Sequence, residues 1–247
     1  MSSRLIKLID LLANSGRPIT LREASEQLHV NKPSLMRLLK FMREENLASH
    51  DDGVEGYTLG PKVLLWAGAY QKNLNLLRVS QDRLRKLMNE CNETVILYML
   101  SGLSRIVLSV EFPSREVNPH VELGSAIPIP YGAGGRVIAA FLEPSLLEKI
   151  LSNPVEPWAR ITVWRPRALK AECRKIQKRF VAVSRGDRSP ETWAMASPIF
   201  NHRNQVIGNL AIVSPSYRFA AVKHFQKTLI KVAGEISSEM GSSIKFP

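Results

Sequence analysis

Three helical patterns in the first 46 residues, separated by very short connections, constrain the fold of this chain more than any other feature of its sequence. In the first pattern, apolar residues recur at the spacing of one helical face. These residues are Leu5, Leu8, Ile9 and Leu12. Gly16 and Pro18 then end the helix, because both residue types interrupt a helical backbone. Thr20 followed by Glu23 has the spacing of a capping box, which predicts a short second helix through Leu28.

The third helix is predicted to run from Asn31, which can cap its first turn, to about Asn46. Pro33 is tolerated in the first turn because the backbone donor that proline lacks would be unpaired there. The predicted buried stripe of this helix consists of Leu35, Leu38, Leu39 and Met42. The helical repeat assigns to the opposite face Pro33, Arg37, Lys40 and Glu44, flanked by Ser34, Met36 and Phe41.

A two-stranded hairpin is predicted after the third helix, with strands at 48–50 and 57–59 around a turn-rich segment. Three helices followed by a hairpin are typical of a winged helix-turn-helix. We therefore assign residues 1–60 to an N-terminal all-α winged helix-turn-helix with a small β-wing. Residues 61–75 then continue at helical spacing with a broad apolar stripe. This stripe predicts a linker helix that packs on another subunit or on the next domain.

A winged helix-turn-helix binds DNA with its third helix, because the major groove of a duplex admits an α-helix. Arg37 and Lys40 are expected to face the DNA, and Arg22 and Lys32 to neutralise phosphates. The predicted DNA-binding residues are Arg22, Lys32, Ser34, Met36, Arg37 and Lys40. The alternative is a helical protein-interaction module with a solvated basic face. The hairpin and the capped second helix favour double-stranded operator DNA as the partner.

Residues 76–247 have the mixed pattern of an α+β domain. The predicted helices are 76–92, Gly132–Phe141, Ser145–Leu151, Leu169–Lys178 and Ala220–Gly241. The predicted strands are Thr94–Leu100, Arg105–Glu111, Val121–Leu123, Ala194–Phe200 and Val206–Ser214. The last two strands are separated by residues 201–204, which have the composition of a hairpin turn.

Most of the net charge of +12 belongs to this C-terminal part of the chain. Residues 1–75 hold 10 basic and 8 acidic side chains, whereas residues 76–247 hold 24 and 14. Much of the excess lies between Arg160 and Arg188. This basic segment is either a solvated helix face or a surface that faces an anion or flanks the DNA.

Neither catalysis nor a cofactor is indicated by the sequence. The five histidines are scattered, and neither a G-x-S-x-G elbow nor a pair of carboxylates at catalytic spacing is present. Cys91 and Cys173 are far apart, which supports neither a disulfide framework nor a zinc site. Lys7 and Asp10 interrupt the apolar N-terminal stretch and exclude a secretory leader or a membrane span there. We therefore expect a cytoplasmic protein that is not an enzyme.

A glycine-rich stretch at 132–135 opens a predicted helix and could present backbone amides to an anion. A dinucleotide site would need a strand just before it, but the prolines at 128 and 130 argue against a central strand. A simple tight loop is the alternative. Trp193 could line a ligand pocket or pack in the core.

Over nearly its full length the chain resembles the IclR (isocitrate-lyase-regulator) family of bacterial transcription factors. The segment ITLREASEQLHVNKPSLMRLLKFMREENL resembles the family's helix-turn-helix, and YTLGPKVLLWAGAY resembles its wing exit and linker helix. The segments GSAIPIPYGAGGRVIAAFL and FVAVSRGDRSPETWAMASPIFNHRNQVIGNLAIVS resemble the parts that enclose its effector pocket. The resemblance implies a GAF-like effector-binding domain over 76–247, a homodimer or a tetramer built as a dimer of dimers, and control by a small carboxylate or aromatic metabolite.

The chain departs from the family pattern at several positions. Pro130 and Arg136 replace the usual His and Lys, and Met36 stands where the recognition helix often has His. An acidic residue and a cysteine of the pocket become Ser184 and Ala194. The effector-binding residues that the resemblance implies are Ala133, Gly134, Ser184, Ala194 and Ser214.

Two alternative functions remain open at this stage. In the first, the C-terminal domain of a DNA-binding regulator binds no ligand and serves only for dimerisation. In the second, the chain is a small-molecule-binding protein or an enzyme whose N-terminal helices do not bind DNA.

Overall fold

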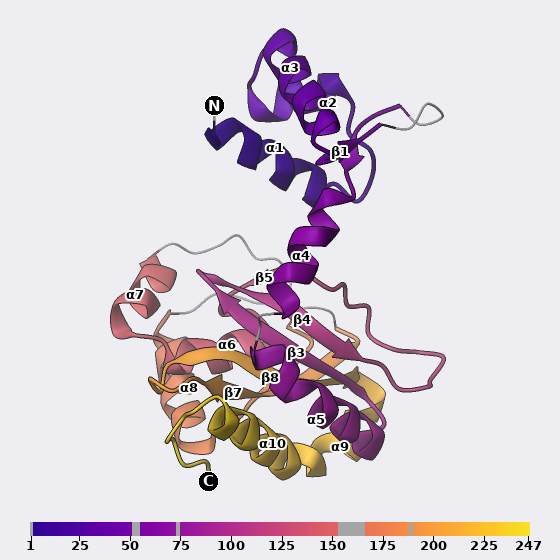
Figure 1. Cartoon of the computed structure of the whole chain (residues 1–247). Helices are drawn as coiled ribbons and strands as arrows, with labels where there is room; N and C mark the ends of the chain where they lie inside the picture. Colours follow the sequence, from indigo (N-terminus) through magenta and orange to yellow (C-terminus); the bar gives the residue numbers. More distant parts are fainter. Residues whose placement is uncertain (1, 51–54, 73–74, 153–165, 188–189) are drawn as a thin grey trace. The chain divides into compact units, whose positions relative to one another are not determined.

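The computed structural model describes residues 2–50, 55–72, 75–152, 166–187 and 190–247. It consists of two compact units, residues 1–74 and 75–247, each with its own core (Figure 1). This arrangement confirms the predicted fold class of an N-terminal helix-turn-helix domain and a C-terminal α+β domain. The exact domain borders at residues 60 and 75 stay predictions.

The first unit contains the predicted three helices, the hairpin and the helix that follows it. Their bounds are α1 Ser2–Asn14, α2 Leu21–Leu28, α3 Lys32–Glu44, β1 Ala48–Ser49, β2 Thr58–Leu59 and α4 Lys62–Lys72. Both predicted caps are present. The Thr20 hydroxyl accepts a bond of 3.2 Å from the Glu23 amide, and the Glu23 carboxylate accepts one of 2.9 Å from the Thr20 amide. Asn31 Oδ1 accepts a bond of 3.0 Å from the Ser34 amide.

The predicted apolar stripes of α1 and α3 meet in one core. Its largest buried members are Leu8, Leu35, Leu39 and Met42, all at most 1% exposed. The wing is attached to this core by a pair of backbone hydrogen bonds between Ile19 and Tyr57, of 2.9 and 2.8 Å. The tip of the wing at 51–54 lies outside the described residues.

The second unit is built on a six-stranded antiparallel sheet with the order β5-β4-β3-β8-β7-β6. The strands are β3 Thr94–Ser101, β4 Ser104–Glu111, β5 Ala126–Pro128, β6 Ala182–Arg185, β7 Thr192–Phe200 and β8 Val206–Pro215. The helices are α5 Asn75–Cys91, α6 Gly132–Phe141, α7 Pro144–Ser152, α8 Pro166–Arg179, α9 Phe219–Val222 and α10 Gln226–Glu239. Helices α6 and α8 pack on one face of the sheet, and α5 and α10 cover the other (Figure 1).

Two predicted elements of this unit differ from the structure, and one strand of the structure was not predicted. The strand predicted at Val121–Leu123 is wrong, because these residues are irregular and the strand β5 begins only at Ala126. This strand lies at the sheet edge, where Pro128 is tolerated because an edge position needs no second ladder partner. The closing helix predicted over Ala220–Gly241 is broken into α9, a 3₁₀ turn and α10. Strand β6 was not predicted, because four residues give too little periodicity to detect.

Candidate DNA-binding surface and effector cavity

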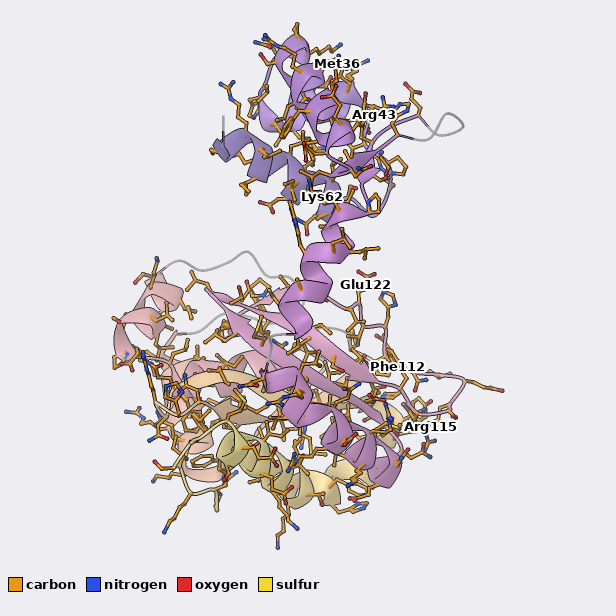
Figure 2. The ribbon with its side chains drawn as sticks, viewed as in Figure 1. Met36, Arg43, Lys62, Phe112, Arg115 and Glu122 are labelled. Atoms are coloured by element: carbon orange, nitrogen blue, oxygen red, sulfur yellow. The ribbon has the colours of Figure 1, made fainter. Side chains whose placement is uncertain are left out.

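Helix α3 presents the face that its sequence predicts. The leucine stripe is buried, whereas Lys32, Met36, Arg37 and Lys40 are exposed and Ser34 is half-buried. Figure 2 places Met36 on this helix, where its side chain is 44% exposed. An exposed apolar residue between two cations suits contact with a base edge or a thymine methyl group. The arrangement fits the predicted DNA-binding residues, and their contacts with DNA stay predictions.

The predicted DNA-binding cations differ in their ion pairing. Arg22 pairs with Glu26 at 2.9 Å, and Lys40 lies 4.0 Å from Glu44, with all four side chains more than half exposed. Exposed pairs of this kind contribute roughly 0–1 kcal/mol, so a phosphate could replace the carboxylate at small cost. Among the described residues, neither Lys32 nor Arg37 has an ion-pair partner.

Helix α4 has the broad apolar surface that its sequence predicts. Leu64, Leu65 and Trp66 are 75, 72 and 52% exposed in the single chain. The start of the helix is fixed to Glu45, the residue that follows α3, by a Lys62–Glu45 ion pair of 2.6 Å.

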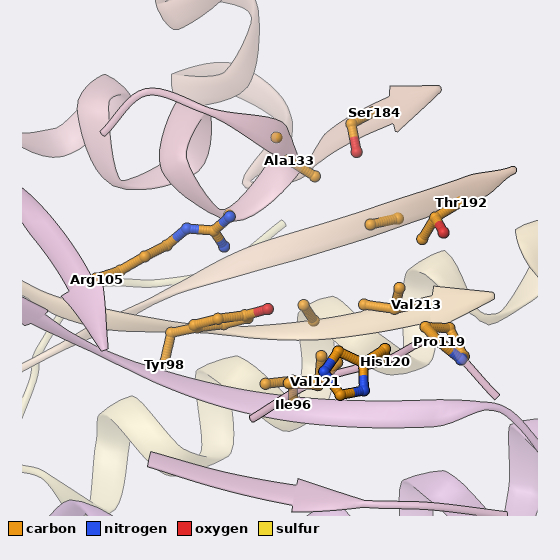
Figure 3. A pocket seen from close by; sticks show the side chains of 14 residues that line it. Ile96, Tyr98, Arg105, Pro119, His120, Val121, Ala133, Ser184, Thr192 and Val213 are labelled. Carbon is orange, nitrogen blue, oxygen red and sulfur yellow. The ribbon is translucent and has the colours of Figure 1, made fainter. Parts of the chain in front are cut away.

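A cavity of about 240 Å³ lies in the second unit, between the sheet and the start of α6 (Figure 3). Its walls come from β3, β4, β6, β7 and β8, from the glycine stretch at 132–134, and from the loop at 119–121. This volume is below the usual range for drug-sized ligands, roughly 300–1,000 Å³, and suits a compact metabolite. Segments far apart in the sequence therefore meet around one cavity.

Four of the five predicted effector-binding residues line this cavity: Ala133, Gly134, Ser184 and Ala194. Ser214 does not line it. Side chains alternate across a strand, and Val213 is the residue of β8 that faces the cavity, so Ser214 points to the other face. Trp193 does not line the cavity either, and packs edge-on against Phe219 with ring centroids 5.1 Å apart.

Arg105 is a cavity residue that sequence reasoning missed. Its side chain lies at one end of the cavity beside Tyr98, with Ser184 and Thr192 toward the other end (Figure 3). Arg105 is only 5% exposed, its guanidinium stacks 4.3 Å above the Tyr98 ring, and Nη2 donates a bond of 3.0 Å to the Tyr131 carbonyl. An arginine at an inward-facing strand position was the available signal. A rigid, buried guanidinium can bind a carboxylate through two parallel hydrogen bonds.

Arg136, at the position of the family's usual lysine, does not line the cavity. Its side chain forms ion pairs with Glu172 at 3.1 Å and Asp187 at 2.5 Å, and donates a bond of 2.8 Å to the Val183 carbonyl. These contacts join α6 to α8 and to β6. Arg136 therefore positions the strand that carries Ser184.

The loop that carries residues 119–121 to the cavity is fixed by two arginines. Arg218 forms a bidentate pair with Glu93, with N–O distances of 2.6 and 2.9 Å, and also donates a bond of 3.0 Å to the Val117 carbonyl. Arg115 donates a bond of 2.8 Å to the Asn92 carbonyl. Hydrogen bonding to the Glu93 carboxylate raises the pKa of the Arg218 guanidinium above its ordinary value.

Other kinds of site receive no support from the described residues. They contain no group of three or more His, Cys, Asp or Glu side chains that could hold a metal ion. Their helices include none that is long and apolar enough to span a bilayer. Cys91 and Cys173 are buried, and burial raises the pKa of each thiol to about 11.

Comparison with known protein families identifies the kind of protein to which these two units belong. Residues 3–52 match the IclR helix-turn-helix domain, and residues 68–238 match the C-terminal domain of bacterial transcriptional regulators of the IclR type. The chain belongs to the IclR family. It is a DNA-binding transcriptional regulator and not an enzyme, as its sequence predicted.

The IclR-family relatives cover almost the whole chain. The HTH-type transcriptional regulator BhcR of Paracoccus denitrificans is 23% identical, with 96% of this chain and 86% of the relative covered. The crystal structure of an IclR transcriptional regulator from Silicibacter sp. superposes with a TM-score of 0.87 at 25% identity, covering 100 and 99% of the two chains. An IclR homologue from Microbacterium hydrocarbonoxydans, crystallised with 4-hydroxybenzoate, superposes with a TM-score of 0.81 at 18% identity, covering 96 and 97%.

Proposed function

We propose that this IclR-family regulator reads its operator with α3 and changes its DNA affinity when a small carboxylate occupies the cavity of the second unit. The observation that carries the first part is the exposed face of Lys32, Met36, Arg37 and Lys40 above a fully buried leucine stripe. Arg37 is the proposed base-reading residue, because an arginine can donate two hydrogen bonds to a guanine edge in the major groove. Arg22 and Lys32 are proposed to neutralise phosphates, and Ser34 to donate to a phosphate or to a base edge.

The DNA-binding proposal is tested by titrating the full chain against duplexes from its own upstream region and against duplexes of random sequence. Arg37→Ala is expected to cost roughly 1–3 kcal/mol of operator binding, with little loss on random DNA. An equal loss on every duplex would reassign Arg37 to a phosphate contact. Operator binding no tighter than random binding would refute sequence-specific recognition.

The effector proposal rests on Arg105. A guanidinium that is 5% exposed, stacked on Tyr98 and lining the cavity provides a rigid anion-binding group. Ser184 at the other end can donate or accept a hydrogen bond, Ala133 lies between them (Figure 3), and Gly134 also lines the cavity. We propose a compact metabolite with one carboxylate beside Arg105 and a small polar or aromatic body. Ser214 is not retained as a contact.

A thermal-shift series can test this class of effector with short-chain and aromatic carboxylates, 4-hydroxybenzoate among them, beside the matching neutral amides. Carboxylates are expected to raise the melting temperature of the wild-type chain, and Arg105→Met is expected to abolish the shift. Equal shifts from the neutral amides would refute carboxylate recognition. No shift from any carboxylate would favour the alternative of a ligand-free dimerisation domain.

We also propose that α4 contributes to a homodimer interface, from which a dimer of dimers could form. The exposure of Leu64, Leu65 and Trp66 supports this, since three adjacent large apolar side chains are costly to leave in water. A change in how the subunits are arranged would then connect effector binding to DNA affinity. The expected location is the cytoplasm, where operator DNA lies.

A further inference from the structure

A second groove, of about 420 Å³, lies within the helix-turn-helix unit. It is lined by α1 on one side and by the turn between α2 and α3 and the first turns of α3 on the other. Three cations reach it: Arg4 and Lys7 from α1, and Arg37 from α3. Ser34 lines it as well, half-buried in the first turn of α3. The groove therefore joins two proposed DNA-contacting residues to two cations that the sequence did not single out.

The charges in this groove are unbalanced. None of the described residues that line it is acidic. Arg4, Lys7 and Arg37 are all exposed, and none forms an ion pair with another described residue. The neighbouring cations Arg17 and Arg22, by contrast, are paired with glutamates. The groove thus gathers three cations that no carboxylate of the described residues neutralises.

Like charges that converge without a counterion repel one another, and a bound anion removes that cost. A polyanion with several charges suits this groove, because Arg4 and Lys7 reach it from α1 and Arg37 reaches it from α3. The groove also continues the α3 surface that carries Arg37. The phosphodiester backbone beside the major groove satisfies both conditions, and phosphate contacts supply much of the affinity of DNA-binding proteins.

We propose that Arg4 and Lys7 of α1 bind the phosphodiester backbone of the strand that passes the start of α3, and so hold this helix in the major groove. The inference rests on the proposed DNA binding by α3. It adds a contact that is independent of base sequence, made by a helix that otherwise serves to bury α3. Arg37 lines the same groove and so connects the backbone contact with the base-reading surface.

The test measures binding of the full chain to one mixed-sequence duplex over a series of KCl concentrations. Each phosphate contact contributes about 0.9 to the slope of log K against log salt. Arg4→Gln and Lys7→Gln are each expected to lower that slope by about 0.9, and the double variant by roughly twice as much. The ratio of operator to random binding should stay the same, since a backbone contact carries no sequence information.

Arg17→Gln is the matched control. It removes the same charge from the same unit, but Arg17 is already paired with Glu23 at 2.7 Å and does not line the groove. The slope of log K against log salt should change less in Arg17→Gln than in Arg4→Gln or Lys7→Gln. The charge-conserving pair Arg4→Lys and Lys7→Arg should restore the wild-type slope, which separates loss of charge from any loss of folding.

A double Gln variant that folds and keeps the wild-type salt slope would overturn the inference and leave the DNA-binding function intact. A slope that falls equally in Arg17→Gln would also overturn it, because the effect would then come from net charge alone. Failure of the wild-type chain to bind any duplex at low salt would instead refute the proposed function itself, and the inference with it.

Discussion

The ion pair between Glu93 and Arg218 gives a stability prediction that can be worked from the structure. The two side chains are 3 and 15% exposed, and the guanidinium binds both carboxylate oxygens. Removing one partner leaves the other charge buried without compensation. Arg218→Met also removes the bond to the Val117 carbonyl and so frees the loop that reaches the cavity.

Breaking a buried pair in this way typically costs about 3–5 kcal/mol of unfolding free energy. The lower end is expected here, about 3 kcal/mol, because Arg218 keeps some contact with water. Lys231→Met supplies the control in the same unit. Lys231 is 77% exposed and lies 3.9 Å from Glu235, so its loss should cost less than about 0.5 kcal/mol.

Urea unfolding of the full chain, followed by circular dichroism, measures these differences. Glu93→Gln combined with Arg218→Met should cost clearly less than the sum of the two single changes, since the double variant leaves neither charge unpaired. The reasoning is refuted if Arg218→Met costs no more than Lys231→Met, or if the two single effects simply add.

Three further outcomes are expected. Gly134→Ala should weaken effector binding while leaving DNA binding intact in isothermal titrations, because the new Cβ would collide with Arg105 Nη1 and lie 2.8 Å from Asn209 Nδ2. The pKa of Glu23 is lowered from 4.5 to about 2, first by the hydrogen bond from Arg17 and then by those from Thr20. The contribution of the Glu23 carboxylate to helix capping should therefore be present above pH 4.5 and disappear as the pH falls towards 2. An NMR titration of the Glu23 carboxyl carbon would measure this pKa, and Arg17→Gln should raise it. Both thiols should react slowly with a disulfide reagent at neutral pH unless urea is added, because their pKa values are raised to about 11 by burial.

The local signals in the sequence were sufficient to predict the helices, caps and buried face of the first unit. Thr20, Asn31 and the leucine stripe of α3 act within a few residues of one another, so spacing alone predicts the caps and the buried face. The late hairpin was likewise predictable, because residues 201–204 join two strands that pair directly. Family resemblance then pointed to the glycine stretch and to Ser184, and both line the cavity.

Only the tertiary structure decided which distant residues meet. The sequence shows Arg105 only as a charged residue within a predicted strand. Its position in the cavity depends on the pairing of β4 with β3 and β5. Ser214 and Val213 differ by one residue, but the pleat of β8 sends one toward the cavity and the other away. The groove of Arg4, Lys7 and Arg37 likewise exists only once α1 packs beside α3. Caps and stripes are determined by neighbours along the chain, whereas a site depends on strand register and helix packing, which involve the whole fold.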